Sequence, residues 1–488
     1  MRPEDLLVKE RIGKLNQIKK LGINPYPSKF DKKDNISEII SNYSKLKNEE
    51  NSKAKVKTAG KILAIREMGK ASFVDIQDSN SKIQCFIRED EVKKKYNLYK
   101  LFDIGDIVGV EGNPFRTKRG ELSILVKDLF ILSKSLKPLP DKWYGLKDIE
   151  EKLRKRYLDI LTNNDVKDMF IKKAKFWQTI RNFLLDRGFL EVETPILENT
   201  TGGAAAKPFG THHNTLDLNV YLRISCGELW QKKLLVGGFE KIFEIGRIFR
   251  NEGMDSEHLQ DYSQMEFYWA YADYKDGMEL VQEMYKKIAK EVLGSLKFKT
   301  RGYEVDLGKK WAIYDYEEFI KEKTKVDIYK ANAGEIRKKL DFLKMEYEKS
   351  ADKWRLVDSL WKYCRSSLSG PGFLVNQPVE VSPLAKRNEK DSRKVEQFQV
   401  IIAGTELGNG YSELNDPLDQ EERFKEQRKL KEAGDVEAHD FDESFIEALK
   451  YGMPPACGFG VSERFFAYLM DKPVRECVIF PLMKPEKP

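Results

Sequence analysis

The sequence predicts an α+β protein of several domains, in which a small β-barrel precedes a larger mixed region. The chain has 488 residues, about three times the roughly 150 of a common domain, so two or three domains are expected. Short strand-like runs dominate residues 57–132, whereas helices and strands alternate after residue 151. Apolar residues make up 41% and charged residues 34% of the chain, which is typical of a folded protein in water and excludes a wholly disordered one.

Composition also limits the location and the kind of site. No stretch approaches about 18 consecutive apolar residues, and acids occupy the N-terminus where a secretory signal would need an apolar core. We therefore expect a cytoplasmic protein that does not cross a membrane. The five cysteines are far apart, no C-x-x-C pair occurs and the chain has four histidines, so neither structural zinc nor a disulfide framework is expected.

Residues 1–55 are predicted to form a basic, partly helical N-terminal arm. Apolar residues recur three or four positions apart among lysines, at Val8, Ile12, Leu15 and Ile18, and Gly22 ends this pattern. The arm contains 13 basic and 8 acidic residues, a net charge of +5. This excess suits a polyanionic partner, although a solvated helix face is the better explanation of the charge taken alone.

Residues 56–135 are predicted to form a five-stranded barrel. The strand-like segments cover residues 61–67, 72–75, 82–87, 107–111 and 122–132. A helix fits at residues 89–99, between the third and fourth strands, where an oligonucleotide-binding (OB) barrel carries one. A proline-bearing linker, residues 136–150, follows the barrel.

Residues 151–488 are predicted to form the larger mixed domain. A long helix at residues 167–187 is followed by strands around residues 190–193, 206–211, 222–224, 242–249 and 265–272. Residues 275–390 return to charged, lysine-rich helical periodicity, which indicates a helical insertion.

A charged strand–loop–strand segment, residues 243–268, is the first candidate for chemistry. Four of its residues are expected to face one another: Arg250, Glu252, Glu266 and Tyr268. An arginine fork matches a phosphate or carboxylate in a bidentate way, and a sheet supports it rigidly. Packing alone does not require this mixture of opposite charges.

Three motifs resemble those of the class II aminoacyl-tRNA synthetases. FEIGRIFRNEG at residues 243–253 resembles motif 2, and GFLEVETP at residues 188–195 resembles motif 1. GFGVSER at residues 458–464 resembles motif 3. TGGAAAKPF at residues 201–209 and ELGNGYSELND at residues 406–416 narrow the resemblance to lysyl-tRNA synthetases of the bacterial and eukaryotic class II kind.

The resemblance implies a fold and a reaction. The catalytic domain would be a six-stranded antiparallel sheet flanked by helices, and motif 1, with Pro195, would form the interface of a homodimer. As a lysine–tRNA ligase, the protein would activate L-lysine with ATP, forming lysyl-adenylate and pyrophosphate. It would then transfer lysine to the 3′ end of tRNA(Lys), with magnesium as the cofactor.

The resemblance also implies a lysine site. Its residues would be Gly203, Glu228, Arg250, Glu266, Tyr268, Asn409, Tyr411 and Glu413. Glu413 and Tyr268 would bind the ε-ammonium group of lysine. Glu228 would bind its α-amino group, and Arg250 would bind its carboxylate. A buried ammonium requires a carboxylate and further acceptors, so acidic and basic ends a side-chain length apart suit lysine.

The ATP site follows from the same resemblance. Its residues would be Arg250, Glu252, His258, Tyr262, Glu406 and Arg464, with Arg250 and Arg464 as the catalytic arginines. Glu406 and Gln399 would be the magnesium ligands. Since the family has glutamate where this chain has Gln399, magnesium binding at this position is expected to be weaker. Leu259 and Gln260 also depart from the family pattern, which usually has Asn-Pro after the histidine.

The barrel would read the anticodon. Phe73 would stack on a base, Gln84 would read its edge and Glu121 would make a third contact, which is how such barrels recognise unstacked bases.

Three alternatives remain on the sequence alone. An aspartyl- or asparaginyl-tRNA synthetase shares the barrel and motifs but lacks the acidic pocket. A truncated relative that attaches lysine to a translation factor lacks the barrel. A non-catalytic RNA-binding paralogue would account for Gln399 and Leu259, but not for the presence of both Arg250 and Arg464.

Overall fold

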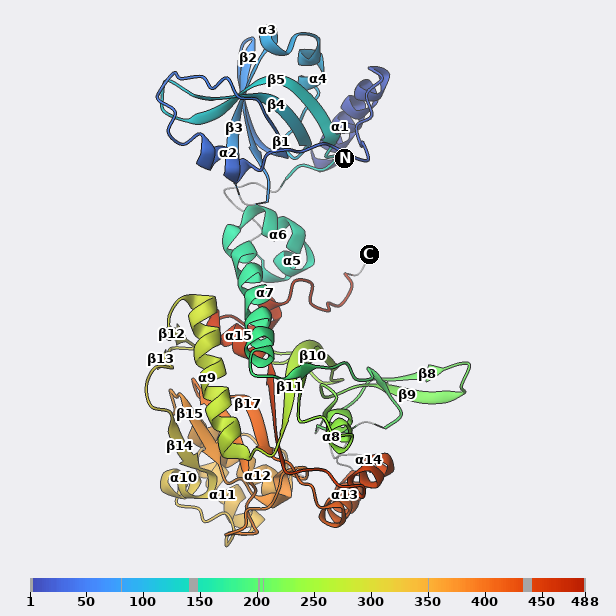
Figure 1. The fold of residues 1–488 in the computed structure, drawn as a ribbon, viewed down its shortest axis with the longest axis vertical. Coiled ribbons are helices and arrows are strands. Elements are labelled where there is room, and N and C mark those ends of the chain that lie inside the picture. The colour runs from blue at the N-terminus through green and yellow to red at the C-terminus, as the bar shows by residue number, and fades with distance from the viewer. Residues whose placement is uncertain are drawn as a thin grey trace. The chain divides into compact units, whose positions relative to one another are not determined.

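The computed structural model describes residues 3–79, 81–139, 148–200, 202–204, 206–349, 351–432 and 441–486 (Figure 1). The chain divides into two compact units, Met1–Lys147 and Asp148–Pro488. Most of the predicted linker, residues 140–147, lies outside the described residues.

The first unit contains the predicted OB barrel. Its strands are β1 (Val56–Met68), β2 (Ala71–Gln77), β3 (Lys82–Arg88), β4 (Ile107–Arg116) and β5 (Leu122–Ser133). They close in the order β1-β2-β3-β5-β4, with β3 and β5 parallel. The expected helix between β3 and β4 is divided into α3 (Glu89–Val92), the 3₁₀ turn η1 (Lys93–Lys95) and α4 (Tyr96–Tyr99).

The N-terminal segment folds onto this barrel. It contains α1 (Pro3–Lys20) and α2 (Ile36–Asn42). Ile18 on α1 and Ile36 and Ile39 on α2 are buried in the same apolar core as the barrel strands. The predicted basic arm is therefore part of one folded unit with the barrel, because these buried residues are covered by the barrel. Ile12 of the predicted apolar face stays exposed.

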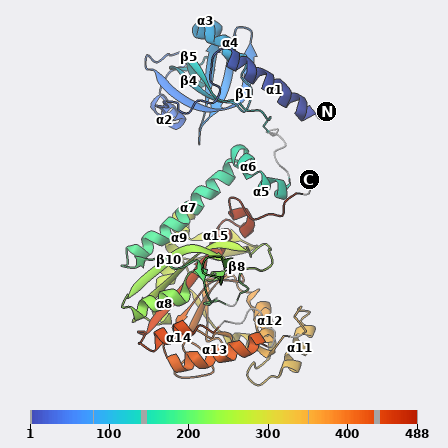
Figure 2. The ribbon, with the colours of Figure 1, turned by 90° about the vertical axis from the view of Figure 1, so that its right-hand side faces the viewer.

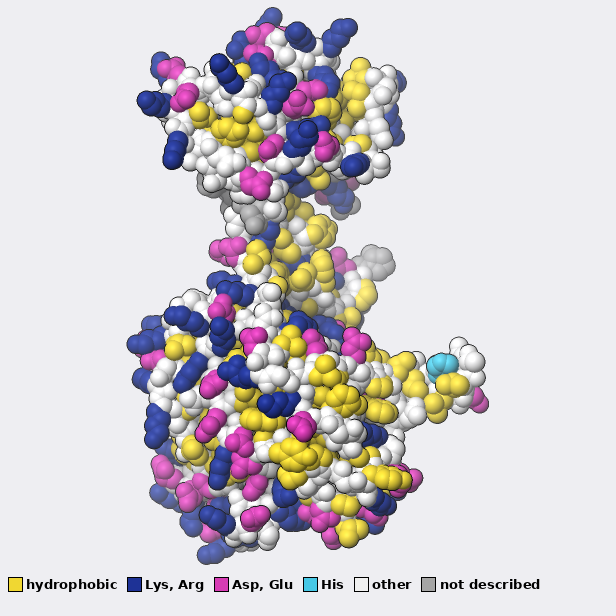
Figure 3. All heavy atoms as spheres, viewed as in Figure 1, with side chains coloured by type: hydrophobic (Ala, Val, Ile, Leu, Met, Phe, Trp, Pro, Cys, Tyr) yellow, Lys and Arg dark blue, Asp and Glu magenta, His cyan; other side chains and the backbone are white. Residues whose placement is uncertain are grey.

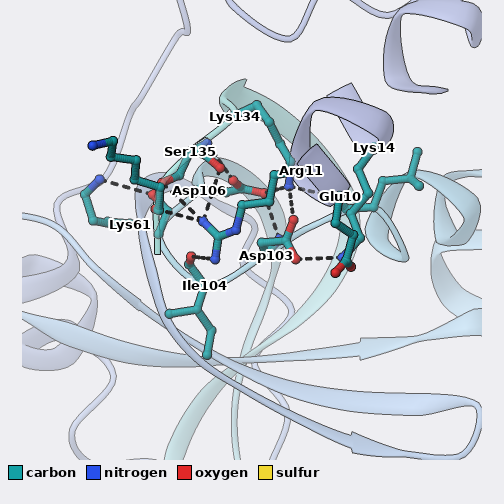
Figure 4. Close-up of polar contacts among 12 residues, drawn as sticks. Glu10, Arg11, Lys14, Lys61, Asp103, Ile104, Asp106, Lys134 and Ser135 are labelled. Carbon is teal, nitrogen blue, oxygen red and sulfur yellow. Dashed lines mark hydrogen bonds and ion pairs between the residues drawn. The ribbon is translucent and has the colours of Figure 1, made fainter. Parts of the chain in front are cut away.

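A buried polar cluster attaches α1 to the barrel (Figure 4). Arg11 donates to three backbone carbonyl oxygens, 2.9 to 3.2 Å away. The ammonium of Lys134 is fully buried and lies 2.5 Å from Asp103 and 2.8 Å from Asp106. Lys14 on α1 pairs with Asp103 at 2.7 Å. Because these charges are withdrawn from water, each depends on its partners.

We expect Asp106→Asn to lower the free energy of unfolding by about 3 kcal/mol, because it leaves the Lys134 ammonium undercompensated in the protein interior. Urea denaturation of the full chain measures this change, and amide hydrogen exchange assigns it to the peptides of α1 and the barrel. The matched control is Asp90→Asn, whose surface pair with Arg88 is expected to contribute less than about 1 kcal/mol. Equal effects of the two substitutions would contradict the prediction.

The second unit is built on a mixed eight-stranded sheet (Figures 1 and 2). Its order is β14-β15-β16-β17-β18-β11-β10-β6. The strands are β6 (Leu190–Glu191), β10 (Lys241–Phe249), β11 (Asp261–Ala270), β14 (Ala312–Asp315), β15 (Gly372–Val375), β16 (Gln397–Ile402), β17 (Thr405–Ser412) and β18 (Ala456–Ser462). The six central strands are antiparallel, as predicted, whereas β14 and β6 extend the two edges in parallel.

Helices α7 (Asn164–Leu185) and α9 (Tyr274–Leu293) pack together on one face of this sheet. The buried residues of α9, such as Val281, Met284 and Ile288, recur at helical spacing and belong to the main core. A separate apolar cluster surrounds Trp361 and unites α10 (Tyr316–Thr324), α11 (Ala333–Phe342) and α12 (Lys353–Arg365). The separately packed helical part therefore begins near Tyr316, later than the predicted residue 275.

The remaining elements surround the sheet. A three-stranded sheet of order β7-β9-β8 projects beside it, and β12 pairs with β13. Their bounds are β7 (Leu197–Glu198), β8 (Gly210–His213), β9 (Leu218–Leu222), β12 (Lys297–Thr300) and β13 (Tyr303–Asp306). The other helices are α5 (Ile149–Arg154), α6 (Arg156–Thr162), α8 (Glu228–Val236), α13 (Pro417–Glu432), α14 (Glu443–Leu449) and α15 (Arg464–Leu469). Throughout the described ranges, no helix combines the length and apolar character needed to span a membrane.

Candidate active site

A cavity of about 430 Å³ lies on the face of the sheet opposite α7 and α9. Strand alternation produces this division: on β11, Met265 and Phe267 face the apolar core, while the intervening residues face the cavity. The cavity contains these predicted site residues: Gly203, Glu228, Arg250, Tyr262, Glu266, Tyr268, Gln399, Glu406, Asn409, Tyr411, Glu413 and Arg464.

Three buried carboxyl groups form the acidic end of the cavity: Glu228, Glu266 and Glu413. Glu266 accepts hydrogen bonds from the backbone N–H of Cys226 at 2.7 Å and from the hydroxyl of Tyr268 at 3.1 Å. Burial raises the pKa of both Glu266 and Glu413 well above the usual carboxyl range. A cation that enters the cavity would therefore stabilise the ionised form of both carboxyl groups.

Glycine makes the close approach of these groups possible. A Cβ on Gly458 of β18 would lie 2.1 Å from Oε1 of Glu413 and 2.6 Å from the ring of Tyr268. Gly203 has φ +85°, and its Cβ would lie 2.7 Å from Glu228. Side chains at these two positions would displace the residues that line the acidic end.

Lys232 is part of the acidic end, although it was not among the predicted site residues. Its ammonium lies 2.8 Å from Oε1 of Glu228 and 2.5 Å from Oε2 of Glu413. Burial alone would lower the pKa of Lys232, but the two carboxylates raise it overall, so the ammonium form is favoured. Lys232 follows Glu228 by four residues on α8, a spacing that places both on one helix face and could have indicated the pair.

The opposite, arginine end contains Arg250 and Arg464. The Nε of Arg250 donates to the carbonyl oxygen of Ile224 at 3.4 Å, and its guanidinium lies 5.9 Å from the ring centroid of Tyr262. Arg464 donates to the backbone carbonyl oxygen of Glu406. The cavity thus has three buried carboxyl groups at one end and two guanidinium groups at the other, where Glu406 also lies.

Glu406 and Gln399 lie on the neighbouring strands β17 and β16 and line the cavity. The Glu406 carboxylate accepts the indole N–H of Trp361 at 2.5 Å and lies 3.3 Å from Arg365. Among the described residues, no group of three or more histidine, cysteine, aspartate or glutamate side chains could hold a metal ion. One carboxylate and an amide suit a magnesium ion whose other ligands are substrate phosphates and water.

Two predicted ATP residues lie outside the cavity lining. Glu252 and His258 are exposed on the loop between β10 and β11. Glu252 accepts the backbone N–H of Lys207 at 3.3 Å, and His258 lies 2.9 Å from Asp255. Of the four residues expected to face one another, Arg250, Glu266 and Tyr268 line the cavity. The fourth, Glu252, lies on the loop instead.

The structure brings Phe73, Gln84 and Glu121 to the outer face of the barrel. Val74 and Cys85, which alternate with the first two, face the core. Gln84 donates to Glu121 at 3.2 Å. Phe86, which the sequence analysis missed, stacks on Phe73 with ring centroids 4.6 Å apart. Period-two alternation from Gln84 could have found it.

Pro195 lies at an exposed apolar surface of the second unit. Large exposed apolar side chains lie near it in sequence at Leu190, Ile196 and Leu197, and others lie on the β8–β9 hairpin at Leu216 and Leu218. Figure 3 shows apolar side chains gathered beside the β8–β9 hairpin. Exposed apolar side chains gathered on one face are typical of association sites in proteins.

Comparison with known proteins identifies both units. Residues 148–484 match the family described as tRNA synthetases class II (D, K and N), and residues 56–132 match the OB-fold nucleic acid binding domain.

Curated relatives match along nearly the whole chain. The lysine–tRNA ligase of Thermotoga sp. (strain RQ2) is 43% identical over 98% of this chain and 96% of its own length. The lysine–tRNA ligase of Moorella thermoacetica is 44% identical over 99% of both chains. The lysine–tRNA ligase of Staphylococcus epidermidis is 42% identical over 97% of both. With matches of this extent, the chain belongs to the lysine–tRNA ligase family of class II tRNA synthetases.

Proposed function

We propose that this protein activates L-lysine with ATP and transfers it to tRNA(Lys). The observation that carries the proposal is the charge of the cavity. The acidic end holds three buried carboxyl groups and one buried ammonium, that of Lys232, which pairs with Glu228 and Glu413. This leaves a formal excess of two negative charges when all four groups are ionised. Two guanidinium groups lie at the other end. A molecule with two ammonium groups and one carboxylate matches both ends.

Lysine would lie across the acidic end with its carboxylate toward Arg250. Oε1 of Glu413 is buried and has no hydrogen-bond partner among the described residues, so it can accept from the ε-ammonium. Glu228 would hold the α-amino group. The Oδ1 atom of Asn409 already accepts from Gln397 at 2.7 Å, which leaves the amide nitrogen to donate to the carboxylate. A neutral amino acid would leave Oε1 of Glu413 without a hydrogen-bond donor and would be rejected.

The first chemical step would be an in-line displacement at the α-phosphorus of ATP. A lysine carboxylate oxygen forms the new bond to phosphorus, the bond to the bridging oxygen breaks, and its electrons leave with pyrophosphate. The carboxylate needs no deprotonation, so no general base is required. Arg250 and Arg464 would orient the phosphates and offset their charge, while Tyr262 would stack on adenine.

Magnesium would be held by Glu406 and Gln399 together with the triphosphate. The ion would neutralise phosphate charge and polarise the phosphoryl oxygens. Gln399 supplies a neutral oxygen where a second carboxylate would bind a hard cation more strongly.

The second step would use tRNA, and the protein would act as a homodimer. The 3′-terminal ribose hydroxyl would attack the carbonyl carbon of lysyl-adenylate and release AMP. Phe73, Gln84 and Glu121 would contact the anticodon, and the basic N-terminal segment, residues 1–55, would attract the tRNA backbone. The apolar surface near Pro195 would form the interface of a homodimer, and the protein would act in the cytoplasm.

Lysine-dependent exchange of pyrophosphate into ATP tests the function. We expect exchange with lysine, and Glu413→Gln should raise KM for lysine about 100-fold, because the substitution removes one buried charged hydrogen-bond acceptor. Glu389→Gln, which alters an exposed carboxylate, is the control and should behave as the parent. Absence of exchange in folded protein would instead support a non-catalytic RNA-binding protein.

Lysine binding should strengthen as the pH rises. Burial raises the pKa of Glu413 to about 8, so at lower pH the empty site binds a proton that the lysine ammonium must displace. The dissociation constant for lysine should fall by up to about tenfold per pH unit below this pKa. Calorimetry in two buffers of different ionisation enthalpy measures the released proton. A dissociation constant that is independent of pH up to that value would contradict the assignment.

The magnesium requirement should depend on Gln399. We expect Gln399→Glu to lower the magnesium concentration that gives half-maximal exchange, because a second carboxylate increases the attraction for the ion. Glu406→Gln should shift the requirement in the opposite direction and serves as the matched comparison. Identical magnesium dependence of the parent and Gln399→Glu would refute the predicted weaker binding.

A further inference from the structure

We propose that Lys232 is a positioning residue that sets the lysine specificity of the cavity. Its ammonium would hold Glu228 and Glu413 in fixed positions, so that each presents acceptor capacity to one substrate amine. The inference rests on the proposed function, since it concerns how the same cavity recognises lysine.

Side chains from several elements pack around Lys232 and fix its position. Its side chain is 1% exposed. Its Nζ lies 5.3 Å from the ring centroid of Tyr411 and 5.9 Å from that of Phe445, within reach of cation–π attraction. One ammonium thus joins helix α8, the end of β17 and helix α14 at the acidic end.

The contacts of Lys232 leave one oxygen of Glu413 for a ligand. Lys232 engages Oε2 of Glu413, whereas Oε1 lies against Gly458, which lines the cavity. Glu413 can therefore bridge two cations, the resident ammonium behind it and a second one in the cavity. Without Lys232, nothing in these contacts would determine which oxygen faces the ligand.

Lys232 also adjusts the charge of the acidic end. Without it, the three carboxyl groups would share a buried site in which no other described residue is shown to pair with them as a cation, and mutual repulsion and burial would favour their protonation. Protonated carboxyl groups attract an ammonium poorly. Removal of this cation should therefore weaken the binding of a cationic substrate, whereas simple charge repulsion between Lys232 and lysine would predict stronger binding.

The test compares Lys232→Met with Lys233→Met in lysine-dependent pyrophosphate exchange. Lys233 is the next residue of α8, and its ammonium donates to Ser444 at 2.8 Å instead. We expect Lys232→Met to raise KM for lysine at least about tenfold and to change KM for ATP less than about twofold. Lys233→Met should keep the parent values. A merely structural role would lower the active fraction and leave both KM values unchanged.

A second variant keeps the inference testable if Lys232→Met does not fold. Lys232→Arg retains a cation but spaces the two carboxylates differently, because guanidinium is a planar fork. It should bind lysine more tightly than Lys232→Met and show a lower ratio of kcat/KM for lysine over ornithine than the parent.

The outcomes separate this inference from the proposed function. If the parent protein shows no lysine-dependent exchange, the proposed function itself is wrong. An active parent whose KM for lysine is unchanged or lowered in Lys232→Met would overturn the positioning role and leave the function intact. If only Lys232→Arg folds, an unchanged preference for lysine over ornithine would overturn it.

Discussion

The cost of burying several carboxyl groups in one cavity governs the architecture of the second unit. An ionised carboxylate withdrawn from water is tolerated only with cations and hydrogen-bond donors around it. Glu228, Glu266 and Glu413 come from α8, β11 and the end of β17, so three distant segments must meet correctly. Lys232 compensates only part of their charge. The negative charge that Lys232 leaves uncompensated enables the cavity to bind a substrate cation.

The central sheet meets this requirement by giving its two faces different roles. On β11, Met265 and Phe267 pack into the core under α7 and α9, while Glu266 and Tyr268 line the cavity. Close packing holds the strands, and the strands hold the polar groups at fixed distances. Gly458 contributes by lacking a side chain, since a Cβ there would collide with Glu413.

The residues expected to bind ATP fall into two groups, those held by strands and helices and those on an exposed loop. Arg250, Tyr262 and Arg464 lie on or beside strands and helices and line the cavity. Glu252 and His258 lie on the exposed loop between β10 and β11. A sheet positions a side chain before the ligand arrives, whereas an exposed loop can move toward the ligand when it binds.

Local patterns in the sequence determined the five strands of the barrel, the helical segment between its third and fourth strands, the long helix that is α7 and the β10–β11 strand pair, because period-two and helical spacings are properties of consecutive residues. The motifs also indicated most residues that line the cavity. The tertiary structure alone decided that α1 joins the barrel core, that α9 belongs to the main core, and that Glu413 pairs with Lys232. These outcomes depend on which distant surface covers an apolar face or compensates a buried charge, and such pairings between remote segments leave no periodic signal in the chain.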